Sequence, residues 1–145
     1  MPYVAPEDGN NRLVDSLDEV KARNGDPPWR ETELATERFR MVVLCWPPGF
    51  VYPKHYHPRA DEFWLVREGQ VRVAFDDEPA RVAGPGSVLF AKKGTVHEMA
   101  AIGEKPLIMI AVVIPNEPDD DIFIETPCER RRSLGIVSEE KFISH

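Results

Sequence analysis

The sequence has few cysteines, no long apolar run and a shortage of positive charge, and each shortage excludes a class of protein. Its two cysteines, Cys45 and Cys128, are too few for a disulfide framework. No apolar stretch approaches the roughly 18 residues that a membrane-spanning helix needs, and the first ten residues lack the charged and apolar regions of a signal peptide. We therefore expect a reduced, cytoplasmic protein with no membrane partner.

Acidic side chains outnumber basic ones by 25 to 18, and the formal net charge is −7 at pH 7. A nucleic-acid groove needs a stripe of basic residues, whereas the one basic cluster of this sequence is the run Arg130–Arg132 in a polar C-terminal stretch. Such a run is more typical of a solvated or partner-contacting segment than of a phosphate site. We therefore expect no nucleic-acid partner.

Frequent turn residues divide the chain into short segments. The 145 residues include 14 prolines and 9 glycines, and the apolar patterns between them favour strands at 38–46, 62–68, 70–78, 87–91, 96–101 and 106–114. The second and third of these are expected to form a hairpin at Glu68-Gly69, and the last, unbroken and apolar, to be buried on both faces. An all-β fold follows, as a sandwich, jelly roll or small barrel.

The two ends of the chain differ from this middle. Ser16 and Glu19 form the pattern of a helix capping box, Leu17 and Val20 fall on one helical face, and Gly25 is placed to end the helix. Residues 25–31 are expected as a linker, and an acidic break follows residue 115. We therefore divide the chain into an N-terminal extension (1–35), a barrel (36–116) and a C-terminal tail (117–145).

Two of the four histidines, His55 and His57, stand one residue apart, and Glu62 follows five positions after His57. On an extended strand the two imidazoles project to the same face, as two ligands of one metal require. If the next strand pairs with this one, the carboxylate points at the same spot and completes the facial triad of non-haem iron sites. Surface polarity and a structural metal clamp are the alternatives that the residue types leave open.

The spacing of the whole stretch is more specific than its residue types. Gly49 is followed after five residues by His55-x-His57, after four more by Glu62, and after six more by Gly69. This stretch resembles the first motif of the cupin superfamily, G(X)5HXH(X)3–4E(X)6G, and agrees with it in full.

A second stretch is similar to the second cupin motif, G(X)5PXG(X)2H(X)3N. It begins at Gly86 and retains Gly94 and His97 at the expected spacing. Lys92 stands where the family has proline, and Ala101 where the family has asparagine. The first departure costs about 0.4–1 kcal/mol through a freer unfolded chain, and neither removes the histidine.

The resemblance implies an all-β, double-stranded β-helix barrel in which His55, His57, Glu62 and His97 converge on one divalent transition metal. It also implies a catalytic role for Glu62, which would leave the metal to act as a base. Three imidazoles and a carboxylate suit iron, manganese, nickel, zinc or copper, and the spacing does not choose among them.

Strand parity suggests which side chains surround this metal. Trp64 and Val66 share the face of Glu62, while Thr95 and Met99 share the face of the second-motif histidine. They would form an apolar wall of a pocket for a small, partly hydrophobic molecule. The equally open alternative is that Trp64 and Met99 only fill the barrel.

An open-sided metal supports a dioxygenase, isomerase or lyase acting on a small organic molecule. The alternative is a non-enzymatic module that binds or senses a metal or small ligand. Arg38 and Arg40 could reach a substrate carboxylate if they faced inward, although a charged outer face is the commoner outcome. The resemblance also implies a homodimer, because cupin-like barrels often pair through an edge strand.

Overall fold

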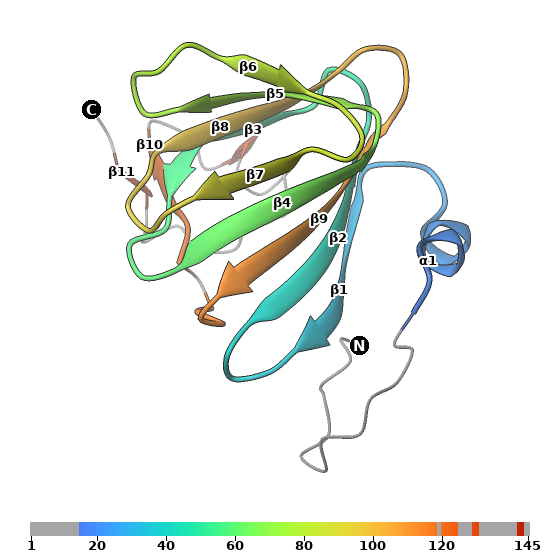
Figure 1. Cartoon of the computed structure of the whole chain (residues 1–145), viewed down its shortest axis with the longest axis horizontal. Coiled ribbons are helices and arrows are strands. Elements are labelled where there is room, and N and C mark those ends of the chain that lie inside the picture. Colours follow the sequence, from blue (N-terminus) through green and yellow to red (C-terminus); the bar gives the residue numbers. More distant parts are fainter. Residues whose placement is uncertain (1–14, 119, 125–128, 131–141, 144–145) are drawn as a thin grey trace.

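The structure, a computed structural model, describes residues 15–118, 120–124 and 129–130 and the backbone of 142–143. Two sheets, antiparallel except for the parallel pair β10–β11, face each other and enclose the core, with helix α1 (Leu17–Asn24) outside them (Figure 1). The predicted all-β double-stranded β-helix is confirmed. Residues 1–14 of the predicted extension and most of the predicted tail, Cys128 included, lie outside the described residues.

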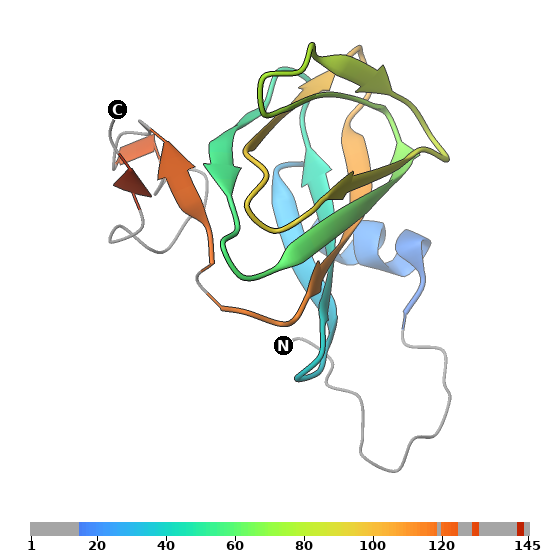
Figure 2. The same ribbon diagram turned by 60° about the vertical axis from the view of Figure 1, so that its left-hand side comes forward.

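The first sheet has five strands in the order β1–β2–β9–β4–β7: Trp29–Ala35, Arg40–Trp46, Leu107–Ile114, Asp61–Glu68 and Val88–Ala91. The second has six in the order β11–β10–β3–β8–β5–β6: Phe142–Ile143, Ile122–Ile124, Val51–Tyr56, His97–Ile102, Gln70–Phe75 and Arg81–Ala83. Figure 2 shows β10 and β11 at one side of the barrel and α1 at the other. The C-terminal strands therefore extend the sheet that carries the histidines.

The six strands predicted between 38 and 114 are all present, as β2, β4, β5, β7, β8 and β9. Strand β9 lies between β2 and β4 at the centre of its sheet, which explains its unbroken apolar run. The core between the sheets includes Val66, Val71, Val73, Met99 and Met109, each at most 2% exposed. Alternate residues of the strands thus face inward, as the period of a strand requires.

The predicted hairpin between 62–68 and 70–78 is wrong. Strands β4 and β5 belong to opposite sheets, and β5 pairs with β6 and β8 instead. The chain crosses between the sheets at Gly69, whose φ is +76°, and a Cβ there would collide with the Pro106 carbonyl oxygen and Leu107 Cα. Only glycine combines this left-handed backbone with so close an approach, and the same residue would also suit a tight hairpin turn.

The predicted N-terminal helix is confirmed as α1. The Ser16 Oγ accepts a hydrogen bond from the Glu19 backbone N–H at 3.3 Å, and Gly25, with a φ of 73°, caps the other end. Val20 packs against Val43 and Cys45 on the outer face of the first sheet. Within the part of the chain that the structure describes, no helix has the length and apolar character that crossing a bilayer requires.

Part of the predicted linker is a strand. Strand β1 begins at Trp29 and pairs with β2 along the edge of the first sheet. Its sequence, WRETELA, carries charged residues that hide the strand pattern. The division at 1–35, 36–116 and 117–145 stays a prediction, although β1 and β10, one from each predicted end segment, both pair with strands of the barrel.

Candidate metal centre

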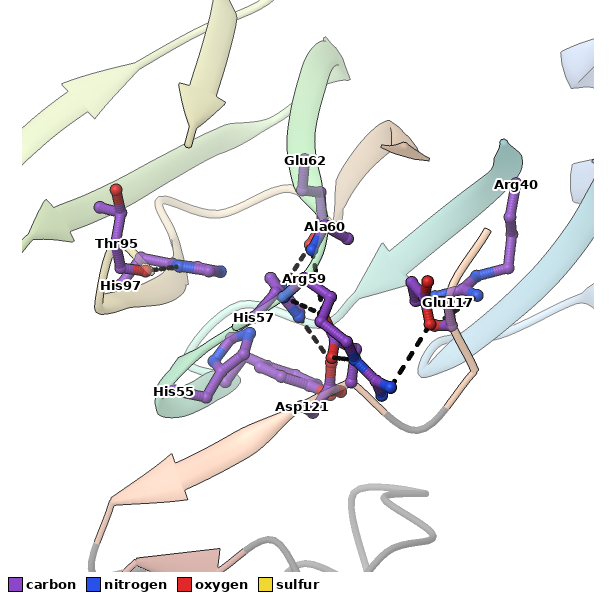
Figure 3. Close-up of polar contacts among 12 residues, drawn as sticks. Arg40, His55, His57, Arg59, Ala60, Glu62, Thr95, His97, Glu117 and Asp121 are labelled. Carbon is purple, nitrogen blue, oxygen red and sulfur yellow. Dashed lines mark hydrogen bonds and ion pairs between the residues drawn. The ribbon is translucent and has the colours of Figure 1, made fainter. Parts of the chain in front are cut away.

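Three histidines meet on the inner face of the second sheet (Figure 3). His55 of β3 lies opposite His97 of β8 in the register of the sheet, and His57 follows the last residue of β3. Their ligand nitrogens all lie within 4.8 Å of one another, and the three residues are 1–6% exposed. The two sequence motifs therefore supply one buried imidazole cluster.

Each imidazole is held through its Nδ1 atom. In His55 and in His97 this atom lies 2.7 Å and 3.0 Å from the carbonyl oxygen two residues earlier, and in His57 it lies 2.9 Å from Asp121 Oδ1. Because these oxygens accept hydrogen bonds, Nδ1 carries a proton in all three rings, and in a neutral ring Nε2 keeps its lone pair. Each ring thus presents Nε2 to the centre, and in His57, whose pKa the neighbouring carboxylates raise to about 10, a metal would replace the Nε2 proton.

The free ring nitrogens give a test of whether a metal fits. The Nε2 atoms of His57 and His97 are buried without a hydrogen-bond partner. A buried polar atom left unpaired costs about 1–3 kcal/mol, and a divalent transition metal would satisfy several imidazole lone pairs at once. The residues present therefore fit a metal ion.

Glu62 approaches this cluster from the opposite sheet, at the start of β4. Its Oε1 lies 2.7 Å from His57 Nε2, but the two atoms are not aligned as a hydrogen bond. Glu62 is not part of the group in which all ligand atoms lie within 4.8 Å of one another. The carboxylate thus approaches His57 from across the barrel, not from a strand paired with β3.

The C-terminal segment brings a second carboxylate that no sequence pattern singled out. Asp121 precedes β10, and its Oδ2 lies 3.3 Å from the Tyr52 hydroxyl, which donates to it. Phe123 is fully buried and stacks on His55 with ring centroids 5.2 Å apart. Pairing of β10 with β3 places these side chains. In the sequence the only signal was a run of acidic residues.

A neighbouring aspartate fixes this segment to the loop between the motif residues. Asp120, 3% exposed, accepts hydrogen bonds from the backbone N–H groups of Arg59 and Ala60 at 3.0 Å and 3.1 Å. It also pairs with Arg59 Nε at 2.9 Å. The segment that follows β9 is therefore a wall of the centre.

Burial and charge set the proton affinities in the centre. Burial lowers the pKa of His55 well below its usual range and also lowers that of His97. Burial acts on His57 in the same direction, but Asp121 and Glu62 outweigh it and raise that pKa to about 10. For Asp121, burial opposes ionisation, yet the hydrogen bond from His57 holds the pKa below its usual range. The rings of His55 and His97 are therefore neutral and can each offer a lone pair to a metal, whereas Asp121 and Glu62 orient the ring of His57.

A cavity of about 60 Å³ adjoins His55 and His57. Trp64 and Met99 are among the residues that line it. Val66, by contrast, is fully buried in the core, and Thr95 holds the ring of His97 through its carbonyl oxygen. Among the described residues these two are not part of the cavity wall.

Two arginines also line the cavity. Arg40 of β2 faces inward, which is the less common of the two outcomes considered for it, and Arg30 of β1 lies beside the same space. Arg38, in the turn between these strands, is exposed. The cavity therefore has a cationic region as well as an imidazole cluster.

Sequence and structural similarities cover the barrel. Residues 42–113 match the model of the Cupin domain family. Germin-like protein subfamily 1 member 5 of Arabidopsis thaliana is 33% identical over 78 residues, which are 49% of this chain and 35% of that protein. Dimethylsulfoniopropionate lyase DddQ of Ruegeria pomeroyi is 31% identical over 64 residues, 44% of this chain and 31% of the lyase. The chain thus spans about a third of the length of either relative.

A crystal structure gives the same picture for the fold. A Klebsiella pneumoniae protein with a double-stranded β-helix domain superposes with a TM-score of 0.64 at 27% identity, over 74% of this chain and 93% of that one. The matched family model spans the strands that carry Glu62 and the three clustered histidines. The chain belongs to the cupin superfamily.

Proposed function

We propose that this protein is an enzyme that depends on one divalent transition metal and acts on a small organic molecule in the cavity. His55, His57 and His97 would hold the metal, with Glu62 as the fourth ligand. The observation that carries the proposal is the pair of buried Nε2 atoms without a hydrogen-bond partner, on rings already fixed through Nδ1, beside a cavity.

Iron, manganese, nickel, zinc and copper all suit this donor set, and the bound ion would polarise a substrate oxygen or activate dioxygen. The side chains of the protein itself would bind and orient the substrate and transfer protons. Tyr52 and Asp121 keep the His57 ring in place. Glu62 lines the cavity and is our candidate for the base that takes a proton from the substrate.

The reaction would be of the dioxygenase, isomerase or lyase type. Among the relatives, DddQ is by its name a lyase of a small organic molecule, which supports the third type. Because the chain covers only 31% of that protein, the substrate does not carry over. The homodimer and the cytoplasmic location also stay predictions, and sedimentation analysis would check the first.

Elemental analysis of protein purified without chelator tests the metal ligands. We expect about one metal ion per chain in the parent protein and a loss of that metal in His57→Ala, because the variant removes one nitrogen donor. Glu98→Ala is the matched control, since its side chain is on β8 next to His97 and alternates to the other face. Metal retained by His57→Ala would contradict the ligand assignment.

Turnover separates the enzyme from a binding module. Oxygen uptake by the iron-loaded protein with candidate small molecules would support a dioxygenase, whereas turnover with zinc or nickel and no oxygen uptake would support an isomerase or lyase. Full metal content without turnover of a broad panel would favour the alternative, a module that binds or senses a metal or small ligand.

A further inference from the structure

Two kinds of polar side chain line the cavity. The first is the imidazoles of His55 and His57 with Glu62 and Asp121, both of which contact His57. The second is Arg30 and Arg40, which line the cavity together with apolar side chains of β2 and β9. The acids of the cavity are therefore paired with His57.

Sheet register gives the backbone distance between Arg40 and Glu62. Arg40 of β2 lies opposite Val113 of β9, and Val113 in turn lies opposite Glu62 of β4. Arg40 and Glu62 thus share one row across the sheet, two strand spacings or about 10 Å apart at the backbone. Both side chains line the cavity from that row, so a molecule that touches both must be short.

The guanidinium of Arg40 is held in place without being neutralised. Its Nη1 donates to Asn116 Oδ1 at 2.9 Å and to the Glu117 carbonyl oxygen at 3.3 Å, both uncharged acceptors. Asn116 is itself fixed, because its Nδ2 donates to the Thr36 carbonyl oxygen at 2.8 Å. Among the described residues, no carboxylate lies within ion-pair distance of Arg40.

Arg30 adds a second positive charge at the rim. It lies opposite Leu44 in the register of β1 and β2, and Leu44 is part of the cavity wall. Arg30 is exposed, so it lies where the cavity meets solvent. In the part of the chain that the structure describes, it too has no carboxylate within ion-pair distance.

We propose that Arg30 and Arg40 form a carboxylate-binding subsite, and that the substrate is a short organic carboxylate whose other end reaches the imidazole cluster. This proposal rests on the proposed function for its reacting end. A planar guanidinium pairs with a carboxylate through parallel charge-assisted hydrogen bonds. Since one water needs about 10–15 Å³, the cavity of about 60 Å³ holds roughly four to six non-hydrogen atoms.

Binding of matched acids and amides tests the subsite. The probes are propionate and butyrate against propionamide and butyramide, followed by ligand-observed NMR and by the fluorescence of Trp46 and Trp64, which line the cavity. We expect the acids to bind at least about tenfold more tightly than the amides, because a hydrogen bond to a charged group is worth more than one between neutral groups. Equal binding of acid and amide would overturn the subsite.

Charge-removing variants locate the binding. Arg40→Gln should weaken butyrate binding by about tenfold or more, and Arg30→Gln should act in the same direction. Among the described residues Arg30 has no ion pair to lose, so its variant keeps the test valid if Arg40→Gln fails to fold. Arg38→Gln removes the same charge from the turn between β1 and β2 and serves as the control. An equal loss of butyrate affinity in this variant would show that only the net charge of the protein matters, and it would overturn the subsite.

Two further outcomes would also overturn the subsite. Inorganic phosphate that displaces butyrate and binds more tightly would identify a phosphate site. Butyrate binding that is lost in His57→Ala but unchanged in Arg30→Gln would mean that the acid binds the metal.

Measurements on chelator-treated protein separate this inference from the proposed function. Arginine-dependent acid binding in a protein that takes up no metal would sustain the subsite and refute the metal-dependent enzyme. Stoichiometric metal binding with no preference for acids over amides would sustain the metal-dependent enzyme and refute the subsite.

Discussion

Two clusters in the described part of the chain bring metal-ligand atoms within 4.8 Å of one another. One is the histidine centre between the sheets. The other, the acidic cluster, consists of Asp15, Glu31 and Glu33 beside α1 and β1. Arg23 lies among these carboxylates: it forms ion pairs with Asp15 and Glu31, and its Nη2 is 3.8 Å from Glu33 Oε2. Judged only by the distances between their ligand atoms, both clusters resemble cation sites.

The difference lies in whether the charge is already balanced. In the acidic cluster, Arg23 is the main cause that lowers the pKa of Glu31 to about 2. Burial, Glu31 and Asp15 raise the pKa of Glu33 to about 8, so this carboxyl keeps its proton at neutral pH. The cluster thus has an internal cation and an internal proton. In the histidine centre, by contrast, the rings of His55 and His97 are neutral, and their Nε2 lone pairs can bind a cation from outside.

The largest expected effect is metal-linked stabilisation of the parent protein. At about 1,000 times the dissociation constant, a bound metal adds about 4 kcal/mol to the free energy of unfolding, or roughly 10 °C in Tm for a chain of this size. His97→Ala should abolish the difference between metal-loaded and chelator-treated protein in calorimetry, because it removes a donor from the centre.

Asp15→Asn is the control for the other cluster, and its metal response should equal that of the parent. The readout is a difference within each variant, so a lower starting Tm of His97→Ala does not affect it. A metal response that survives in His97→Ala and vanishes in Asp15→Asn would reverse the comparison.

A smaller effect is expected from Asp121→Asn. The asparagine keeps an acceptor for His57 Nδ1 but removes the charge that orients and polarises the ring. Loss of such an outer partner of a metal-bound histidine weakens metal affinity by about 10–100-fold. Competition with a chromogenic chelator measures this change.

Glu117→Gln changes the charge of the same segment without touching the imidazoles, and its metal affinity should stay at the parent value. An unchanged affinity in Asp121→Asn would mean that the ring is positioned by packing alone.

The parts of the centre that could be predicted from sequence are those with short, fixed spacing. His55 and His57 share a face because a strand repeats every two residues, and the motif interval carries His97 to the facing position on β8. Asp121 could not be found this way, because it arrives through the pairing of β10 with β3. No local period encodes that contact.

Because β2 packs on both faces, its sequence pattern does not show which of its side chains point into the barrel. Val42 and Leu44 face the cavity, but Val43 and Cys45 are apolar too because α1 covers the outer face. The alternation that would have shown Arg40 pointing inward is therefore lost. The hairpin prediction at Gly69 failed for a different reason, because a glycine suits a hairpin turn and a crossing between sheets equally well.

The smallest effect concerns the proton held in the acidic cluster. The pKa of Glu33 is raised in the folded state, so the folded chain binds this proton more tightly than the unfolded chain. Its contribution to stability is complete below the unfolded pKa of about 4.5 and is lost as the pH rises towards about 8. Glu33→Gln keeps a neutral side chain and should remove this dependence.

Urea unfolding of parent and variant at pH 5, 6.5 and 8 measures the difference. From pH 5 to 8 the parent should lose at least about 1.4 kcal/mol relative to Glu33→Gln, the value of one pKa unit. Other groups that titrate in this range, His57 among them, cancel in the comparison because both proteins contain them. Exposed Glu37 in the β1–β2 turn provides the control, as Glu37→Gln should keep the parent's slope. A parallel pH dependence of parent and Glu33→Gln would mean that the cluster holds no proton, and its three carboxylates would then exceed the charge of Arg23 and compete with the histidine centre for a cation.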